Sequence, residues 1–108
     1  MSRQAFSAII SGEVQWVGFR AFARSQAFQL GVTGYVRNLP DSTVAVVAEG
    51  GVSLLEVFLG KLQRGPGSAR VENVAVTWSE PEGKYVDFRI LYCNRNHHRF
   101  CSNTKKEA

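Results

Sequence analysis

The order of apolar and polar positions in the first half of the chain predicts a strand, a helix and a second strand. Residues 4–14 alternate apolar and polar side chains, which is typical of a half-buried strand. From Phe19 to Leu30 the apolar residues recur at helical spacing, and Gly31 follows at the position of a C-cap glycine. Residues 33–38 are interpreted as a second strand, followed by a turn signal.

The second half of the chain predicts a strand, a helix and two further strands. Residues 43–49 are rich in valine, and the Gly50-Gly51 pair is expected to break the chain before an amphipathic helix at 53–63. Two more strands are predicted at 71–79 and 85–92, with a turn between them.

These elements predict an α+β fold of the ferredoxin-like βαββαβ type. We expect a mainly antiparallel sheet of four or five strands with both helices packed on one face. The phenylalanines expected in the core are Phe19, Phe22, Phe28, Phe58 and Phe88.

Length and composition are those of one small domain. The 108 residues are 44% hydrophobic, which is enough for a packed core without disulfide staples. Lys and Arg number 13 against 9 Asp and Glu, a net charge of +4. This excess of positive charge favours anionic ligands, or it reflects only a slightly positive surface without a specific partner. No basic stripe is interleaved with aromatic residues, so nucleic-acid binding is not expected.

The sequence carries no signal for export or membrane insertion. Residues 1–11 lack the apolar stretch of a signal peptide, and no run approaches the roughly 18 apolar residues of a membrane span. We therefore expect a cytoplasmic monomer with no membrane contact. It would consist of a domain at 1–92 and a basic, polar C-terminal tail at 93–108 that frays.

Cysteine and histidine residues in this tail allow three interpretations. Cys93, His97, His98 and Cys101 are a plausible zinc set, but the spacing matches no common motif, and adjacent side chains diverge in a strand or helix. A Cys93–Cys101 disulfide is sterically possible but is not favoured in a reducing compartment. We expect free thiols and no metal site.

The loop at 12–20 has the features of a phosphate-binding site. It leads into the N-terminus of the first predicted helix, where unpaired N–H groups and the helix dipole favour an anion. Arg20 adds a planar, permanently charged fork of donors. Asn38, eighteen residues later, offers an amide that can hold a water. Each of these residues taken alone also has a structural interpretation. Arg20 could be a helix arginine that faces solvent. Asn38 could be a turn residue bonded to its own backbone, and Gln15 could be a loop residue with local hydrogen bonds.

Two separated motifs flank the first predicted helix. They read Gly12-x-Val14-Gln15-x-Val17-Gly18-Phe19-Arg20 and Gly34-Tyr35-Val36-Arg37-Asn38. Together they resemble the acylphosphatase family, and the segments Gly65-Pro66, Ala69-Arg70-Val71 and Phe88-x-Ile90 are also similar to its pattern. The resemblance covers roughly residues 5–92.

Acylphosphatases hydrolyse carboxyl-phosphate mixed anhydrides, the acyl phosphates, to carboxylate and inorganic phosphate. The resemblance implies a small-molecule acyl phosphate as substrate, inorganic phosphate as product and inhibitor, and no metal or other cofactor. Arg20 would bind the phosphoryl group, and Asn38 would orient the attacking water. The backbone amides that would cradle the phosphoryl oxygens belong to Gln15, Trp16, Val17, Gly18, Phe19 and Arg20.

Two residues depart from the family pattern, in which positions 16 and 42 are commonly glycine. If Trp16 takes left-handed backbone geometry, the strain is about 1–2 kcal/mol. Its side chain could lie across the cradle and block phosphate, or it could point to solvent or over the acyl group of the substrate. Ser42 lies in a turn, away from the expected site.

Three other functions use the same kind of scaffold. A non-catalytic phosphate- or anion-binding module follows if Trp16 closes down the hydrolytic geometry. A domain of a carbamoyl-phosphate-handling assembly would require a longer chain. RNA-binding modules need exposed aromatic residues on the sheet with basic neighbours, and no segment here matches their Lys/Arg-Gly-Phe-Gly-Phe motif.

Overall fold

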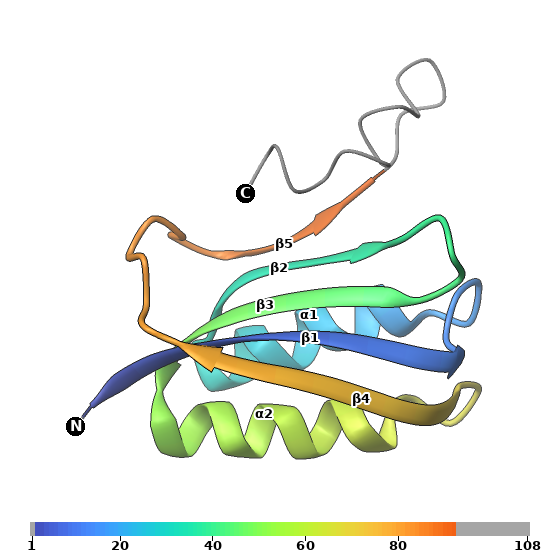
Figure 1. Cartoon of the computed structure of the whole chain (residues 1–108), viewed down its shortest axis with the longest axis horizontal. Helices are drawn as coiled ribbons and strands as arrows, with labels where there is room; N and C mark the ends of the chain where they lie inside the picture. Colours follow the sequence, from blue (N-terminus) through green and yellow to red (C-terminus); the bar gives the residue numbers. More distant parts are fainter. Residues whose placement is uncertain (1, 93–108) are drawn as a thin grey trace.

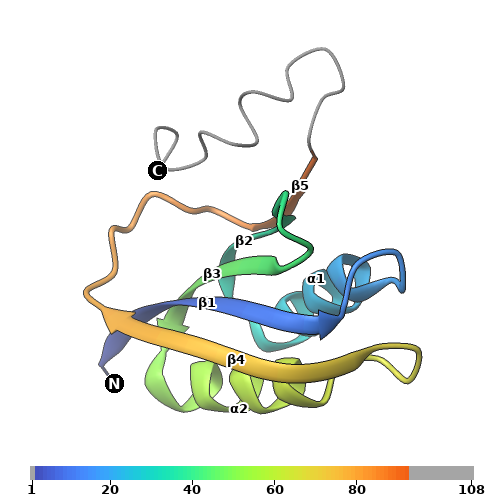
Figure 2. The same ribbon diagram turned by 45° about the vertical axis from the view of Figure 1, so that its right-hand side comes forward.

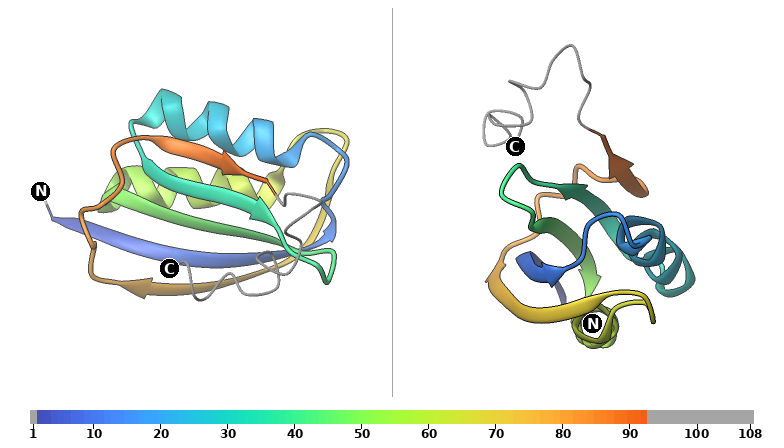
Figure 3. Two further views of the ribbon diagram at one scale, coloured as in Figure 1. Left: turned by 90° about the horizontal axis from the view of Figure 1, so that it is seen from above. Right: turned by 90° about the vertical axis from the view of Figure 1, so that its right-hand side faces the viewer.

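Two helices cover one face of a five-stranded sheet in the computed structural model, which describes residues 2–92 (Figure 1). The strand order is β4-β1-β3-β2-β5, in which β2 and β5 are parallel and the other neighbours are antiparallel. The elements are β1 (Arg3–Glu13), α1 (Phe19–Leu30), β2 (Thr33–Asn38), β3 (Val44–Gly51), α2 (Val52–Arg64), β4 (Arg70–Ser79) and β5 (Phe88–Leu91). Figure 2 and Figure 3 show α1 and α2 side by side on the same face, which confirms the predicted ferredoxin-like α+β architecture.

The core lies between the sheet and the two helices. Phe6 of β1 packs against Phe58 of α2 with ring centroids 6.2 Å apart, and Phe58 lies 5.6 Å from the ring of Phe88 on β5. All three side chains are buried, as is Phe19 at the start of α1. Burial of such a side chain contributes about 1.5–3 kcal/mol, so these rings hold both helices against the sheet.

Helix α1 begins and ends where the sequence predicts. Gly31 caps its C-terminus with a φ of 71°, and its backbone N–H donates to carbonyl oxygens of the last turn. The chain then enters β2 at Thr33 and runs back along the sheet. Asn38, the last residue of β2, thereby reaches the N-terminal end of α1.

Gly34 shows why the second motif begins with glycine. Its φ is 140°, and a Cβ at this position would lie 1.9 Å from the carbonyl oxygen of Val47 on β3. No side chain fits in that space, so glycine is what allows β2 and β3 to pair here.

Two predicted strand boundaries are wrong. Gly50 and Gly51 do not break the chain, because they are the last residues of β3 and pair with β1. The final strand begins at Phe88 and not at Tyr85, because its parallel partner β2 begins at Thr33 and offers the preceding residues no further pairing.

One expected core residue is also misplaced. Phe28 is 85% exposed, and Phe22 is only half-buried. The buried face of α1 is made by Phe19, Ala23 and Ala27, which recur every four residues. Phe28 follows Ala27 by one position, about 100° further round the helix, and therefore projects away from the core.

A buried carboxylate directs the chain into β5. Glu49 of β3 is 2% exposed and accepts hydrogen bonds from the backbone N–H groups of Glu82 (2.8 Å) and Gly83 (3.1 Å). Hydrogen bonds to a charged acceptor contribute about 1.5–3 kcal/mol each. The loop before β5 is therefore fixed to the middle of the sheet, and β5 leaves it at a defined position.

Neither helix in the described part of the chain is long and apolar enough to cross a membrane. The tail at 93–108, with the possible zinc ligands Cys93, His97, His98 and Cys101, lies outside the described residues.

Candidate active site

The loop between β1 and α1 ends in a sharp bend at Gly18, the N-cap of α1. Its φ of 80° confirms that the backbone must turn there. Among residues 2–92 no side chain caps α1, and the first turn of the helix contains no acidic residue. The first N–H groups of the helix are therefore open to an anion, which the positive end of the helix dipole also attracts.

Trp16 adopts left-handed geometry with a φ of 65°, and its side chain is 89% exposed. Trp16 therefore combines a strained backbone, at a cost of about 1–2 kcal/mol, with an indole that faces solvent. Within residues 2–92, the two non-glycine residues with positive φ are Trp16 and Ser42, whose φ is 76°. These are the two positions at which the motif resemblance expects glycine.

A cavity of about 140 Å³ brings the predicted catalytic side chains together. Its lining includes Arg20 from the first turn of α1, Asn38 from the end of β2, and Trp16 and Gly18 from the loop. Arg20 and Asn38 are eighteen residues apart in the sequence, so the fold alone makes them neighbours. Trp16 is among the lining residues, and its exposed side chain does not fill the cavity.

Asn38 presents a buried acceptor beside the cavity. Its Oδ1 is buried and has no hydrogen-bond partner among residues 2–92. This oxygen therefore makes no bond to the nearby backbone. A buried acceptor without a partner costs about 1–3 kcal/mol, so a donor that enters the cavity and reaches it would be held firmly.

The guanidinium of Arg20 lies over the ring of Tyr92, with Cζ 4.8 Å from the ring centroid. A contact of this kind contributes about 0.5–1 kcal/mol at an exposed site and restricts the arginine. Tyr92 follows β5, and the parallel pairing of Arg37 with Leu91 brings Asn38 and Tyr92 to the same end of the sheet. The sequence analysis missed Tyr92 as a site residue. A parallel pairing of β2 and β5 would have indicated it, since the carboxyl ends of parallel strands share one edge.

Gln15 ties the loop to the turn after β2. Its Nε2 donates to the carbonyl oxygens of Leu39 and Thr43, each at 2.8 Å. These hydrogen bonds are not local, because the acceptors lie 24 and 28 residues away in the sequence. Since Leu39 directly follows Asn38, the contact fixes the position of Asn38 relative to the loop.

Asp41 stabilises the turn that Gln15 contacts. Its Oδ1 accepts hydrogen bonds from the hydroxyl (2.5 Å) and the backbone N–H (3.1 Å) of Thr43. These two bonds, the hydroxyl first, lower the pKa of the Asp41 carboxyl below its ordinary value. Asp41 therefore stays ionised, and the turn keeps its shape, throughout the neutral range.

Ser68 holds the other side of the loop. Its hydroxyl donates to the carbonyl oxygen of Val17 at 2.8 Å across 51 residues of sequence. The side chain of Val17 packs against the core, so Val17 offers the site its backbone and not its side chain.

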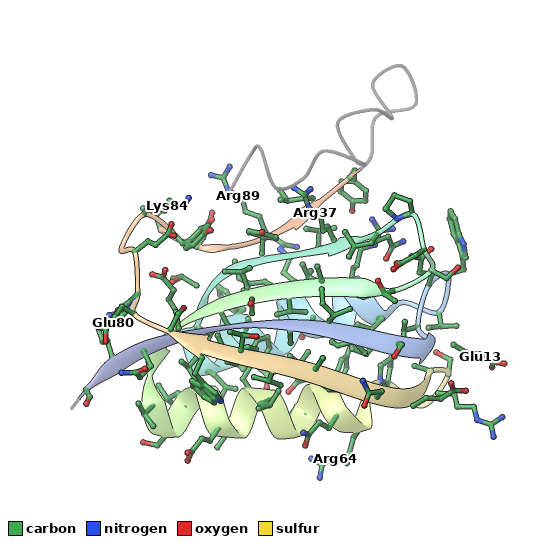
Figure 4. All side chains as sticks on the ribbon, viewed as in Figure 1. Glu13, Arg37, Arg64, Glu80, Lys84 and Arg89 are labelled. Carbon is green, nitrogen blue, oxygen red and sulfur yellow. The ribbon has the colours of Figure 1, made fainter. Side chains whose placement is uncertain are left out.

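Other cations lie outside the cavity lining. Figure 4 shows Lys84, Arg37 and Arg89 along the side of the sheet where β5 lies. Lys84 pairs with Glu82 and Arg89 with Asp87, each at 2.9 Å, and the hydrogen bond that Lys84 donates to Glu82 raises the pKa of Lys84. Arg20 is the cation that lines the cavity itself.

Comparison with known proteins gives a consistent family match. A family model described as acylphosphatase matches residues 6–90. The chain is 54% identical over 76 residues to a curated acylphosphatase of Thermus thermophilus, covering 70% of this chain and 86% of that protein. It is 48% identical over 86 residues to one of Dehalococcoides mccartyi, covering 79% and 94%. The crystal structure of acylphosphatase from Bacillus subtilis matches with a TM-score of 0.80 at 31% identity, covering 82% of this chain and 99% of that one.

Proposed function

The chain belongs to the acylphosphatase family, whose members hydrolyse acyl phosphates, and we propose that Arg20, Asn38 and the backbone amides from Gln15 to Arg20 carry out this reaction. The observation that supports this assignment most strongly is the shared cavity at the start of α1, which Arg20 and Asn38 both line.

The phosphoryl group would sit at the start of α1. Arg20 presents donors in a planar fork that matches two phosphoryl oxygens, and Tyr92 restricts its orientation. The backbone N–H groups of the loop and of the first helical turn would hold the remaining oxygens. Charge on these oxygens in the transition state then meets donors that are already in place.

Asn38 would position the attacking water. Its Oδ1 accepts a hydrogen bond from the water and turns a lone pair of the water oxygen toward phosphorus. The new bond to phosphorus forms as the bond from phosphorus to the acyl oxygen breaks, and the electron pair of that bond leaves with the carboxylate. The proton released by the water passes to a phosphate oxygen. Gln15 maintains this geometry by holding the turn next to Asn38.

This site contains little acid–base machinery, and the substrate explains why. A carboxylate departs as a stable anion and needs no proton from a general acid. What remains is alignment of water with the phosphoryl group and stabilisation of its charge. The residues that line the cavity supply both functions.

The position of Trp16 supports the catalytic function over the binding-module alternative. That alternative required the indole to close the cradle, whereas the side chain is exposed and the cavity is open. In this proposal residues 1–92 form the catalytic domain and residues 93–108 form a tail. The protein acts as a cytoplasmic monomer on a small-molecule substrate and binds neither nucleic acid nor membrane.

Steady-state hydrolysis of acetyl phosphate in the presence of EDTA tests this assignment. Arg20→Ala should lower kcat/KM by about 10²-fold or more and abolish competitive inhibition by inorganic phosphate. Asn38→Ala should lower kcat roughly tenfold or more with a smaller change in KM. Arg24→Ala and Asn73→Ala are matched controls on the exposed surface of α1 and β4. Activity in the Arg20 and Asn38 variants equal to that of these controls would refute the assignment.

A further inference from the structure

The cavity is small for a site that must hold a phosphoryl group together with a bulky acyl group. Its volume of about 140 Å³ is well below the roughly 300–1,000 Å³ of ordinary ligand pockets. Since Arg20 and Asn38 line it, the phosphoryl group takes this space. A bulky acyl group then extends to the mouth of the cavity, against side chains that both line it and face solvent.

Trp16 is the side chain that best fits this description. It lines the cavity and, at 89% exposed, leaves almost all of its indole uncovered by the protein. It also holds a φ of 65°, a backbone conformation that glycine adopts without strain. Backbone strain and an uncovered aromatic surface are both unfavourable for the isolated fold, and strain of this kind clusters at ligand sites.

We propose that the indole of Trp16 is the binding surface for the acyl group and that the enzyme prefers acyl phosphates whose acyl group is aromatic. This inference rests on the proposed function, because it assumes that the phosphoryl group occupies the cavity. A benzoyl group is flat and rigid, since its ring is conjugated with the carbonyl. It can therefore stack on the indole with little loss of conformational freedom, whereas an acetyl group offers only one methyl.

The expected size of the preference follows from the contact. Offset-stacked or edge-to-face aromatic pairs change a binding equilibrium by roughly two- to tenfold beyond the effect of area burial. Tyr92 also lines the cavity, but the guanidinium of Arg20 covers one face of its ring. Trp16, at 89% exposed against 73% for Tyr92, is therefore the ring with more free surface for stacking.

The test compares kcat/KM for benzoyl phosphate with kcat/KM for acetyl phosphate. The two substrates carry the same phosphoryl group, so their ratio cancels any effect of a substitution on the phosphate cradle. Trp16→Ala removes the ring but keeps a Cβ at positive φ, and Trp16→Gly removes both. Trp16→Phe keeps an aromatic ring. Trp78→Phe, on β4, replaces the second tryptophan of the chain, which does not line the cavity.

The proposal predicts that the benzoyl-to-acetyl ratio falls roughly two- to tenfold in both Trp16→Ala and Trp16→Gly. The ratio should be largely kept in Trp16→Phe and unchanged in Trp78→Phe. A ratio in Trp16→Ala equal to that of the parent, with both substrates hydrolysed, would overturn this inference and leave the proposed function intact. If the parent hydrolyses neither substrate, both the proposed function and this inference are overturned.

Discussion

Replacing Gln15 by alanine should uncouple the proposed phosphate-binding loop from the turn that follows Asn38. The side chain donates two hydrogen bonds of 2.8 Å, to the carbonyl oxygens of Leu39 and Thr43. Each acceptor has a second backbone donor: the Ser42 N–H at 3.2 Å on Leu39, and the Leu39 N–H at 2.8 Å on Thr43. Neither carbonyl is left without a partner by the substitution. The loss is therefore the net value of two neutral hydrogen bonds, about 0.5–1.5 kcal/mol each, and not the larger penalty of an orphaned group.

A central value of about 2 kcal/mol lowers Tm by roughly 8–16 °C, because each kcal/mol shifts Tm by about 4–8 °C in a domain of 60–100 residues. The value of kcat for acetyl phosphate should fall as well, since Asn38 is no longer held against the loop. Thermal unfolding followed by circular dichroism, together with the hydrolysis assay, measures both effects.

Two further variants make the Gln15 prediction specific. Gln15→Glu keeps the size of the side chain but turns its donor into a carboxylate that faces two carbonyl oxygens, so it should destabilise at least as much as alanine. Gln63→Ala, on the exposed surface of α2, should stay within about 0.5 kcal/mol of the parent. A Tm for Gln15→Ala equal to that of Gln63→Ala would refute the reasoning.

Three further predictions concern the backbone strain at Trp16, the pH dependence of stability through Asp41, and the orientation of Arg20 by Tyr92. Trp16→Gly should raise Tm by a few degrees, because relief of about 1–2 kcal/mol of backbone strain exceeds the entropic cost of glycine in the unfolded chain; no rise, or an equal rise in Trp16→Ala, would contradict this. The bonds from Thr43 lower the pKa of Asp41, so its ionised carboxyl stabilises the fold above the unfolded pKa of 3.8, and this contribution is lost as pH falls through the lower folded pKa. The Tm difference between the parent and Asp41→Asn should therefore be present at neutral pH and shrink in acid, and a difference that grows in acid would be inconsistent with the bonding. Tyr92→Leu should weaken competitive inhibition by inorganic phosphate roughly two- to fivefold by releasing Arg20, and an unchanged inhibition constant would argue against that role.

Most of the fold was predictable because its signals are local. The C-cap glycine Gly31 marks the end of α1, and the apolar spacing from Phe19 marks its start. The errors arise where tertiary contacts decide the outcome. A Gly-Gly pair is typical of a break between elements, yet pairing with β1 keeps Gly50 and Gly51 in a strand. The exception is Phe28, whose error is local: it follows the buried Ala27 by one position, so its helical phase points it outward.

The proposed catalytic residues were predictable from motifs, but their supporting contacts were not. Arg20 and Asn38 occur in recognisable local patterns and meet in one cavity. The partners of Gln15 lie 24 and 28 residues away, and no local pattern encodes such a separation. The stacking of Arg20 on Tyr92 depends on the β2–β5 pairing, which the order of elements alone does not specify.

The most direct test of the proposed site follows the oxygen atom of the attacking water. Hydrolysis of benzoyl phosphate in ¹⁸O-labelled water, at an enzyme-dependent rate well above the spontaneous one, shows which bond the enzyme breaks. Mass spectrometry of both products then locates the label. Because Arg20 and Asn38 are proposed to direct water at phosphorus, the label should appear in inorganic phosphate and be absent from benzoate. Label in benzoate would mean that water attacks the acyl carbon, which would contradict the assignment of the cavity to the phosphoryl group.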